Sequence, residues 1–209
     1  MVFVPFAVSV PNDENHSAPL RIITGTAKGK RIITLDGEAT RPTSERIKEA
    51  VFSSIQFDVE NRRVLDLFAG SGQLGLEALS RGASFSMFVD SSREALEVVK
   101  RNIKLCGFEG QCKHIESDWR NYIRKASARE KFDLVFVDPP YATECCLDAA
   151  RRLAESGILL EGAIVVLESG TEQIAEADLT ALGYEIIKST HYGKKTFVNI
   201  LLYRGKAEE

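Results

Sequence analysis

The chain has 209 residues, of which 44% are hydrophobic and 27% are charged, and its formal net charge at pH 7 is −3. This composition is ordinary for a globular domain with a full core, and the charge excludes a wholly basic nucleic-acid coat protein. No apolar run approaches the roughly 18 residues that span a bilayer, so we expect no membrane contact and a cytoplasmic location. The four cysteines lack metal-ligand spacing, so we predict reduced thiols and no metal site (Cys106, Cys112, Cys145 and Cys146).

The first sixty residues divide into an extension, a predicted hairpin and a predicted helix. Residues 1–19 begin apolar, turn acidic and carry no Lys or Arg, so we expect a flexible extension and no signal or transit peptide. Residues 20–35 hold two β-branched runs around a centre of Gly and Lys, which predicts a small β-hairpin. In residues 41–55, Ile47 and Val51 are spaced four apart, which predicts a helix with one apolar face.

From residue 61 onward, short apolar runs alternate with amphipathic helical patterns. Such alternation predicts right-handed βαβ units and a parallel sheet covered on both faces. Ser91 and Glu94 stand in capping-box register at the start of one predicted helix, and Gly107 ends it. The predicted strands cover residues 63–68, 85–90, 111–116, 132–137 and 163–169, and the predicted helices between them cover residues 73–81, 91–107, 118–126 and 143–156.

The end of the chain breaks this alternation. Residues 184–204 contain two strand patterns joined at Gly193 with no room for a helix, which predicts an antiparallel hairpin at the sheet edge. We therefore predict an α/β fold: a doubly wound, seven-stranded, mostly parallel Rossmann-like sheet with a C-terminal antiparallel hairpin and a small N-terminal β-hairpin plus helix. The predicted boundaries are an extension at 1–19, an N-terminal unit at 20–60, the main domain at 61–205 and a tail at 206–209.

A glycine-rich loop follows the first predicted strand of this sheet. Residues 70–75 match the pattern G-x-G-x-x-G, and Asp90 follows at the distance expected of a ribose-binding carboxylate. Gly70 and Gly72 allow a sharp turn and allow a ligand to touch bare backbone. These features suit a nicotinamide dinucleotide or any other adenosine cofactor.

Further residues at the strand ends extend the predicted cofactor site. Asp118 and Trp119 place a carboxylate and an aromatic surface where an adenine could lie. Asp66 lies inside the end of the first strand, where it would repel a pyrophosphate but could support the ammonium group of an amino acid. This residue therefore favours S-adenosylmethionine, which carries an ammonium group and no phosphate. Phe68 and Ser91 complete the predicted cofactor-binding residues.

After the strand at 132–137 the chain reads Asp138-Pro139-Pro140-Tyr141. The prolines lack backbone donors, and their carbonyl groups remain acceptors. The Asp138 carboxylate and the Pro139 carbonyl could together hold both hydrogens of an exocyclic amine of a base, while Tyr141 stacks on the ring. Such positioning is worth up to about 7–11 kcal/mol of barrier in favourable cases. The four residues are therefore the predicted catalytic group of an amine methyltransferase.

With these motifs in place, the chain resembles the class I S-adenosylmethionine-dependent methyltransferases, and within them the RsmD family of 16S rRNA guanine-N2 methyltransferases. The resemblance covers about residues 20–205 and includes the segments "RIITGTAKGKRI", "RPTSERIKEAVF", "LDLFAGSGQLGLEALSRGA", "FVDPPY" and "YGKKTFVNILLY". It implies that Asp66, Gly70 and Gly72 line the methionine part of the cofactor, that Asp90 holds the ribose and that Asp118 holds the adenine amine. It also implies methylation at a site of the guanine 966 type, numbered as in 16S rRNA.

Two basic segments flank the more acidic centre of the chain. Residues 21–48 contain seven Lys or Arg against three acidic residues, and residues 188–206 contain five basic residues and no acidic one. We expect a phosphate-facing rim there, with the target base flipped into the Tyr141 pocket. The resemblance further implies that the turn at Arg41 and Thr43 closes over the site. The predicted RNA-binding residues are Arg21, Lys28, Lys30, Arg31, Arg41, Thr43 and Arg46.

Three other functions remain open from the residues alone. The chain could be an amine methyltransferase on DNA adenine or protein glutamine, although those families usually carry Asn where Asp138 stands. The glycine pattern also fits a nicotinamide-dependent oxidoreductase, and the basic segments fit a non-catalytic RNA-binding protein. The favoured expectation is a monomer that acts on ribosomal RNA within a small-subunit assembly particle.

Overall fold

The computed structural model describes residues 20–35, 42–126, 130–140, 143–170, 172–193 and 196–205, with the backbone alone at 42–44. The expectations for the extension at 1–19 and the tail at 206–209 lie outside the described residues. The same holds for Arg41, Tyr141 and the side chain of Thr43.

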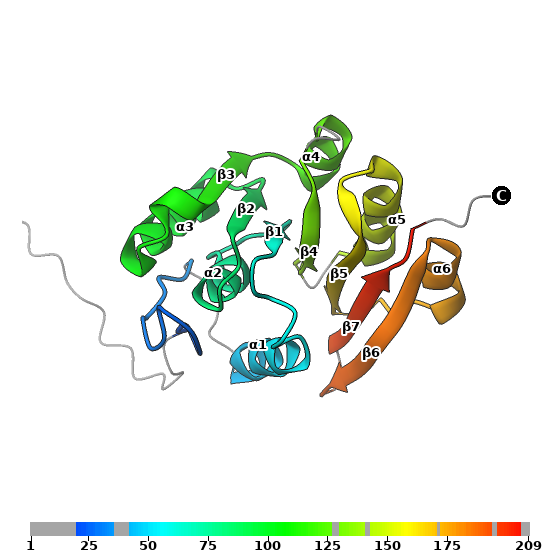
Figure 1. Cartoon of the computed structure of the whole chain (residues 1–209), viewed down its shortest axis with the longest axis horizontal. Coiled ribbons are helices and arrows are strands. Elements are labelled where there is room, and N and C mark those ends of the chain that lie inside the picture. Colours follow the sequence, from blue (N-terminus) through cyan, green and yellow to red (C-terminus); the bar gives the residue numbers. More distant parts are fainter. Residues whose placement is uncertain are drawn as a thin grey trace, which may run out of the picture.

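In the described part of the chain, seven strands form one mixed sheet, as predicted, and their order is β3-β2-β1-β4-β5-β7-β6 (Figure 1). The first five strands pair in parallel, whereas β7 pairs antiparallel with both β5 and β6. The C-terminal hairpin therefore places β7 inside the sheet and β6 at its edge. The strands are β1 (Arg63–Asp66), β2 (Phe85–Asp90), β3 (Cys112–Glu116), β4 (Phe132–Val137), β5 (Leu159–Ser169), β6 (Tyr184–Tyr192) and β7 (Thr196–Tyr203).

Among the described residues, three helices cover each face of the sheet (Figure 1). One face packs against α1 (Pro42–Ser54), α2 (Gln73–Ser80) and α3 (Arg93–Cys106), and the other against α4 (Trp119–Lys125), α5 (Cys146–Ser156) and α6 (Glu176–Ala181). A short 3-10 helix, η1 (Glu109–Gln111), precedes β3. Because apolar residues of β4 point to both faces, its sequence is apolar at every position except Asp133.

Two local predictions need correction. The predicted N-terminal hairpin contains no regular strands: residues 20–35 make a single antiparallel bridge between Arg21 and Arg31. The N-cap of α3 is Ser92, whose side chain accepts a hydrogen bond from the Ala95 amide, and not Ser91. The predicted end of α3 is confirmed, since Gly107 has a φ of 82°.

Residues 20–35 are bound to α2 and α3 by buried polar side chains. The Ile23 and Thr24 amides donate to the carboxylate of Glu77, which is fully buried in α2. The Asn102 side chain of α3 both donates to and accepts from the backbone of Ile33. Gly25 lies so close to α2 that a β-carbon there would overlap the Ser80 carbonyl. Backbone hydrogen bonds still join the two arms at Ile22 and Ile32, and side chains distant in sequence satisfy the backbone groups next to this short pairing.

No described helix has both the length and the apolar character needed to span a bilayer. All four cysteines carry free thiols in the described part of the chain. Burial raises the pKa of the Cys112 thiol to about 11, with the nearby Glu109 adding to the shift, so this thiol is protonated at neutral pH.

Candidate active site

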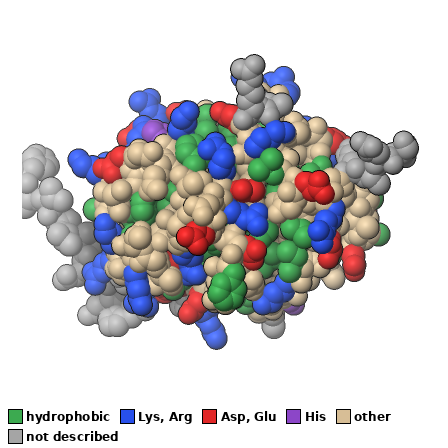
Figure 2. Space-filling model, viewed as in Figure 1, with side chains coloured by type: hydrophobic (Ala, Val, Ile, Leu, Met, Phe, Trp, Pro, Cys, Tyr) green, Lys and Arg blue, Asp and Glu red, His purple; other side chains and the backbone are tan. Residues whose placement is uncertain are grey.

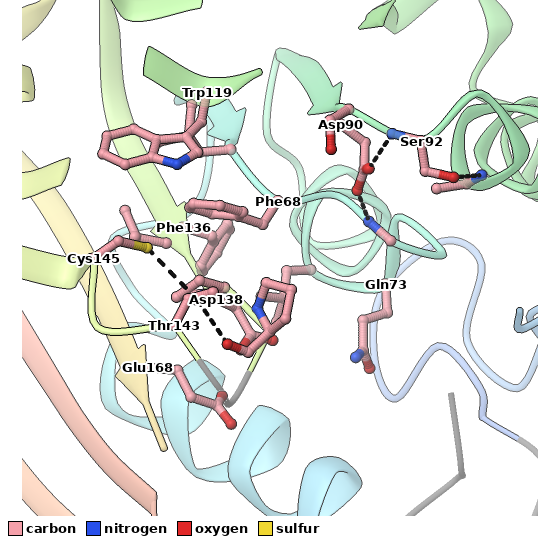
Figure 3. A pocket seen from close by; sticks show the side chains of 18 of the residues that line it. Phe68, Gln73, Asp90, Ser92, Trp119, Phe136, Asp138, Thr143, Cys145 and Glu168 are labelled. Atoms are coloured by element: carbon pink, nitrogen blue, oxygen red, sulfur yellow. Dashed lines mark hydrogen bonds between the residues drawn. The ribbon is translucent and has the colours of Figure 1, made fainter. Parts of the chain in front are cut away.

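A cavity of about 930 Å³ opens at the carboxyl ends of the parallel strands (Figure 3). In doubly wound sheets this edge holds the ligand, because the loops that leave the strands converge there. The volume lies at the upper end of the roughly 300–1,000 Å³ typical of small-molecule sites. Its walls include Phe68 and Gly70 after β1, Asp90 to Ser92 after β2, Ser117 to Arg120 after β3, Asp138 to Pro140 after β4, and Glu168 of β5.

Asp90 connects the first two of these loops. Its carboxylate accepts a 2.9 Å hydrogen bond from the Gly70 amide and a 2.8 Å bond from the Ser92 amide (Figure 3). Each carboxylate oxygen has a second lone pair that remains available to a ligand. Asp90 thus presents its carboxylate to the cavity at the end of β2, and its role in holding a ribose stays a prediction.

Asp66 and Gly72 were expected to border the cofactor, but neither lines the cavity. Asp66 is buried, and its carboxylate accepts a 3.0 Å hydrogen bond from the Gly75 amide in the first turn of α2. Gly72 has a φ of 80°, and a β-carbon there would press on Phe88 and Val99. Both residues therefore support the conformation of the glycine-rich loop from the side that faces away from the cavity.

An aromatic wall closes one side of the cavity. The rings of Phe68 and Trp119 are tilted against each other with centroids 5.8 Å apart, and the Arg120 guanidinium lies 4.3 Å from the Trp119 ring (Figure 3). Asp118 caps α4, since one carboxylate oxygen accepts from the Arg120 and Asn121 amides. The second carboxylate oxygen of Asp118 is therefore the one that would accept a hydrogen bond from an adenine amine.

The opposite wall contains the predicted catalytic loop. Asp138, Pro139 and Pro140 all line the cavity that Asp90 and Phe68 also line. The Thr143 amide and hydroxyl both donate to the Pro140 carbonyl, at 2.9 and 2.7 Å, and so close the turn after the two prolines. The Pro140 carbonyl is therefore engaged within the loop.

The cavity is also lined by residues that were not predicted, among them Glu168, Lys48 and Gln73. Glu168 lies near the carboxyl end of β5, as Asp138 does at β4. Its position at a strand end is therefore the sequence signal that could have identified it. The buried Lys48 ammonium donates to the Arg21 carbonyl at 2.7 Å, and burial lowers its pKa while Glu77 opposes this shift. The Gln73 side-chain oxygen is buried without a hydrogen-bond partner among the described residues.

The described basic residues predicted to bind RNA are exposed, and none lines the cavity (Arg21, Lys28, Lys30, Arg31 and Arg46). Two of them have partners within the fold. Arg21 pairs with Glu45 at 3.1 Å, and the Lys30 ammonium donates to the carbonyls of Leu105 and Cys106 at the end of α3. Figure 2 shows Lys and Arg side chains interspersed with Asp and Glu over the viewed face.

The family model described as "Conserved hypothetical protein 95" matches residues 20–201. The chain belongs to this family. It is 32% identical over 157 residues to ribosomal RNA small subunit methyltransferase D of Haemophilus influenzae, covering 74% of this chain and 81% of that protein. The enzyme of the same name from Escherichia coli K12 is 31% identical over 160 residues, covering 76% and 79% of the two chains.

A solved structure supports the same relationship. The Escherichia coli protein yhhF has a TM-score of 0.77 and 25% identity, with 90% of this chain and all of that chain covered. The family is the RsmD family that the sequence resembles, so the chain is a class I methyltransferase and its cofactor is S-adenosylmethionine. The residues present fit this cofactor: a fixed carboxylate at Asp90, an aromatic wall, and a buried oxygen of Gln73 that needs a donor.

Trp119 offers a direct measure of cofactor binding, because it is the single tryptophan of the chain and lines the cavity. We expect titration with S-adenosylhomocysteine to change the intrinsic fluorescence saturably, since the ligand alters the polarity around the indole. The Trp119→Phe variant serves as the control and should give no such signal. A wild-type emission spectrum that stays constant while calorimetry detects binding would place the ligand elsewhere.

Proposed function

We propose that this protein methylates the exocyclic N2 amine of a guanine in small-subunit ribosomal RNA, at a site of the guanine 966 type, with the base flipped into the cavity. The observation that carries the proposal is that Asp138 and Pro139 line the same cavity as Asp90 and Phe68. A group that can hold an amine thus shares one space with groups suited to an adenosine cofactor. The names of the curated relatives support ribosomal RNA as the substrate.

The chain's own residues would act mainly by orientation. The amine nitrogen of guanine is a poor nucleophile because its lone pair is delocalised into the ring. Acceptors at the Asp138 carboxylate and the Pro139 carbonyl can hold both N–H hydrogens and so direct the lone pair at the methyl group. Bound S-adenosylmethionine supplies that methyl group: the carbon–nitrogen bond forms as the carbon–sulfur bond breaks, and the sulfonium leaves as a neutral thioether.

Proton loss completes the reaction without a strong base. The methylated nitrogen carries a positive charge and is acidic, so its proton passes to the Asp138 carboxylate or to water. Base flipping supplies the access, since an amine inside folded RNA cannot otherwise reach a cofactor held at the base of a cavity. The volume of the cavity, about 930 Å³, is compatible with a cofactor and one purine bound together.

Exposed basic residues of the 20–60 unit would hold the RNA backbone. Lys28 and Arg31 are the best candidates among the described residues, because Lys30 already binds the end of α3. We expect the double variant Lys28→Ala/Arg31→Ala to weaken RNA binding and to lower the slope of log affinity against log salt by about 1 for each phosphate that is no longer neutralised. Filter binding across a salt series measures the slope, and an unchanged slope would exclude these residues.

The decisive test of the function is mass mapping of methylated nucleosides in ribosomal RNA. We expect RNA from cells that lack this protein to lose one N2-methylguanosine in the small-subunit RNA, and purified protein to restore it. Free RNA, assembly particles and mature subunits are compared as substrates, and we propose that a monomer acts on the assembly particle. If the purified protein transferred methyl groups only to DNA or to a protein glutamine, the proposed function would be wrong.

A further inference from the structure

Glu168 is a second carboxylate beside the proposed catalytic aspartate. Val137 of β4 pairs in register with Leu167 of β5, so Asp138 and Glu168 follow at the same level of two adjacent parallel strands. Both residues line the cavity, and Figure 3 shows Glu168 below Asp138 in the view. Orientation of the amine by Asp138 and Pro139 does not require Glu168.

The alternation of side chains along a strand brings both carboxylates to the same face. Phe136 and Val166, each two residues earlier, belong to the core on the α1 side of the sheet, so Asp138 and Glu168 project toward that side as well. The two half-buried carboxylates and the Pro139 carbonyl make this part of the wall rich in acceptors.

An acceptor-rich wall matches one edge of one base. The Watson–Crick edge of guanine presents three hydrogens, two on the N2 amine and one on N1, whereas N1 of adenine is itself an acceptor. Asp138 and Pro139 are assigned to the two amine hydrogens. The adjacent Glu168 then lies opposite the N1 hydrogen, and it would repel an acceptor at that position.

We propose that Glu168 reads the N1 hydrogen of the target base and so makes the enzyme specific for guanine. This inference rests on the proposed function, because it takes N2 of a flipped base as the methyl acceptor. A site built to accept a substrate N–H discriminates strongly against an analogue without it, because the carboxylate oxygen then faces the lone pair of N1 and not a hydrogen.

The test compares two target bases that carry the same amine. Small-subunit particles are reconstituted with guanine or with 2-aminopurine at the methylated position, since 2-aminopurine keeps the N2 amine but lacks the N1 hydrogen. We expect wild-type protein to prefer guanine in kcat/KM by a factor of about 100 or more. In Glu168→Gln the amide can donate to N1 of 2-aminopurine, so the preference should fall by at least about tenfold.

Controls separate a base-reading role from a structural one. Glu161→Gln makes the same substitution at the exposed far end of β5 and should leave both rates unchanged. S-adenosylhomocysteine affinity, followed at Trp119, should be equal in wild type and Glu168→Gln. If Glu168→Gln does not fold, Glu168→Asp decides, because a shortened acceptor should reduce the guanine rate more than the 2-aminopurine rate.

Two results would count against Glu168 in different ways. An equal loss on both bases in the Glu168 variants would overturn the inference and leave the proposed function intact. Failure of wild-type protein to methylate the guanine particles would remove the proposed function, and this inference with it.

Discussion

The Asp138→Ala variant is expected to bind S-adenosylmethionine as the wild-type protein does and to lose about 10²–10⁴-fold in the rate of methyl transfer. The loss follows because the variant removes one of the two acceptors that orient the amine and the nearest proton acceptor for the product. Single-turnover transfer of labelled methyl groups to small-subunit particles measures the rate, and Trp119 fluorescence measures cofactor affinity.

Two further variants separate the roles of the Asp138 carboxylate. Asp138→Asn keeps an acceptor oxygen, so it should be at least about tenfold faster than Asp138→Ala. Asp133→Asn, at the amino end of the same strand, keeps the oxygen that accepts from the Arg63 amide and should match wild type. A near-normal rate in Asp138→Ala would refute the proposed role, and a matching loss of cofactor affinity would assign Asp138 to the cofactor instead.

The pattern of the sheet could be predicted because it depends on local sequence. A parallel strand covered on both faces must be apolar on both sides, and β4 shows this as an apolar run interrupted at Asp133. The six-residue α6 escaped prediction because Leu179 is its single buried residue, which leaves no apolar periodicity to detect. Residues 20–35 pair over a single bridge and not over two strands, because Glu77 and Asn102, far along the chain, bind the neighbouring backbone groups.

The residues of the candidate site could be predicted where they lie at the carboxyl ends of strands. Asp90 and Asp138 each end a strand or follow it directly, and both line the cavity. Asp66 also stands at a strand end, but its carboxylate holds the first turn of α2, and sequence position could not distinguish the two uses. Lys48 could not be predicted, because its partners, the Arg21 carbonyl and the Glu77 carboxylate, lie far from it in sequence.

Glu77→Gln is expected to cause the largest loss of stability, about 3–5 kcal/mol in the free energy of unfolding. Glu77 is fully buried, lies 2.8 Å from the Arg81 guanidinium and 3.8 Å from the Lys48 ammonium, and accepts from two amides of the N-terminal unit. A neutral amide leaves the buried Lys48 and the half-buried Arg81 without their counter-charge and turns a donor toward a donor. Urea denaturation measures the loss, and hydrogen exchange should show residues 20–35 opening first.

Glu97→Gln is the matched control, because Glu97 also pairs with a lysine within 4 Å but on the exposed surface of α3. Solvent screens that pair, so the control should unfold at the wild-type urea concentration. Since Leu20, Thr34 and Lys48 also line the cavity, Glu77→Gln should weaken methyl transfer along with stability. Coincident denaturation curves for Glu77→Gln and wild type would show that the buried charges do not bind the N-terminal unit to α2.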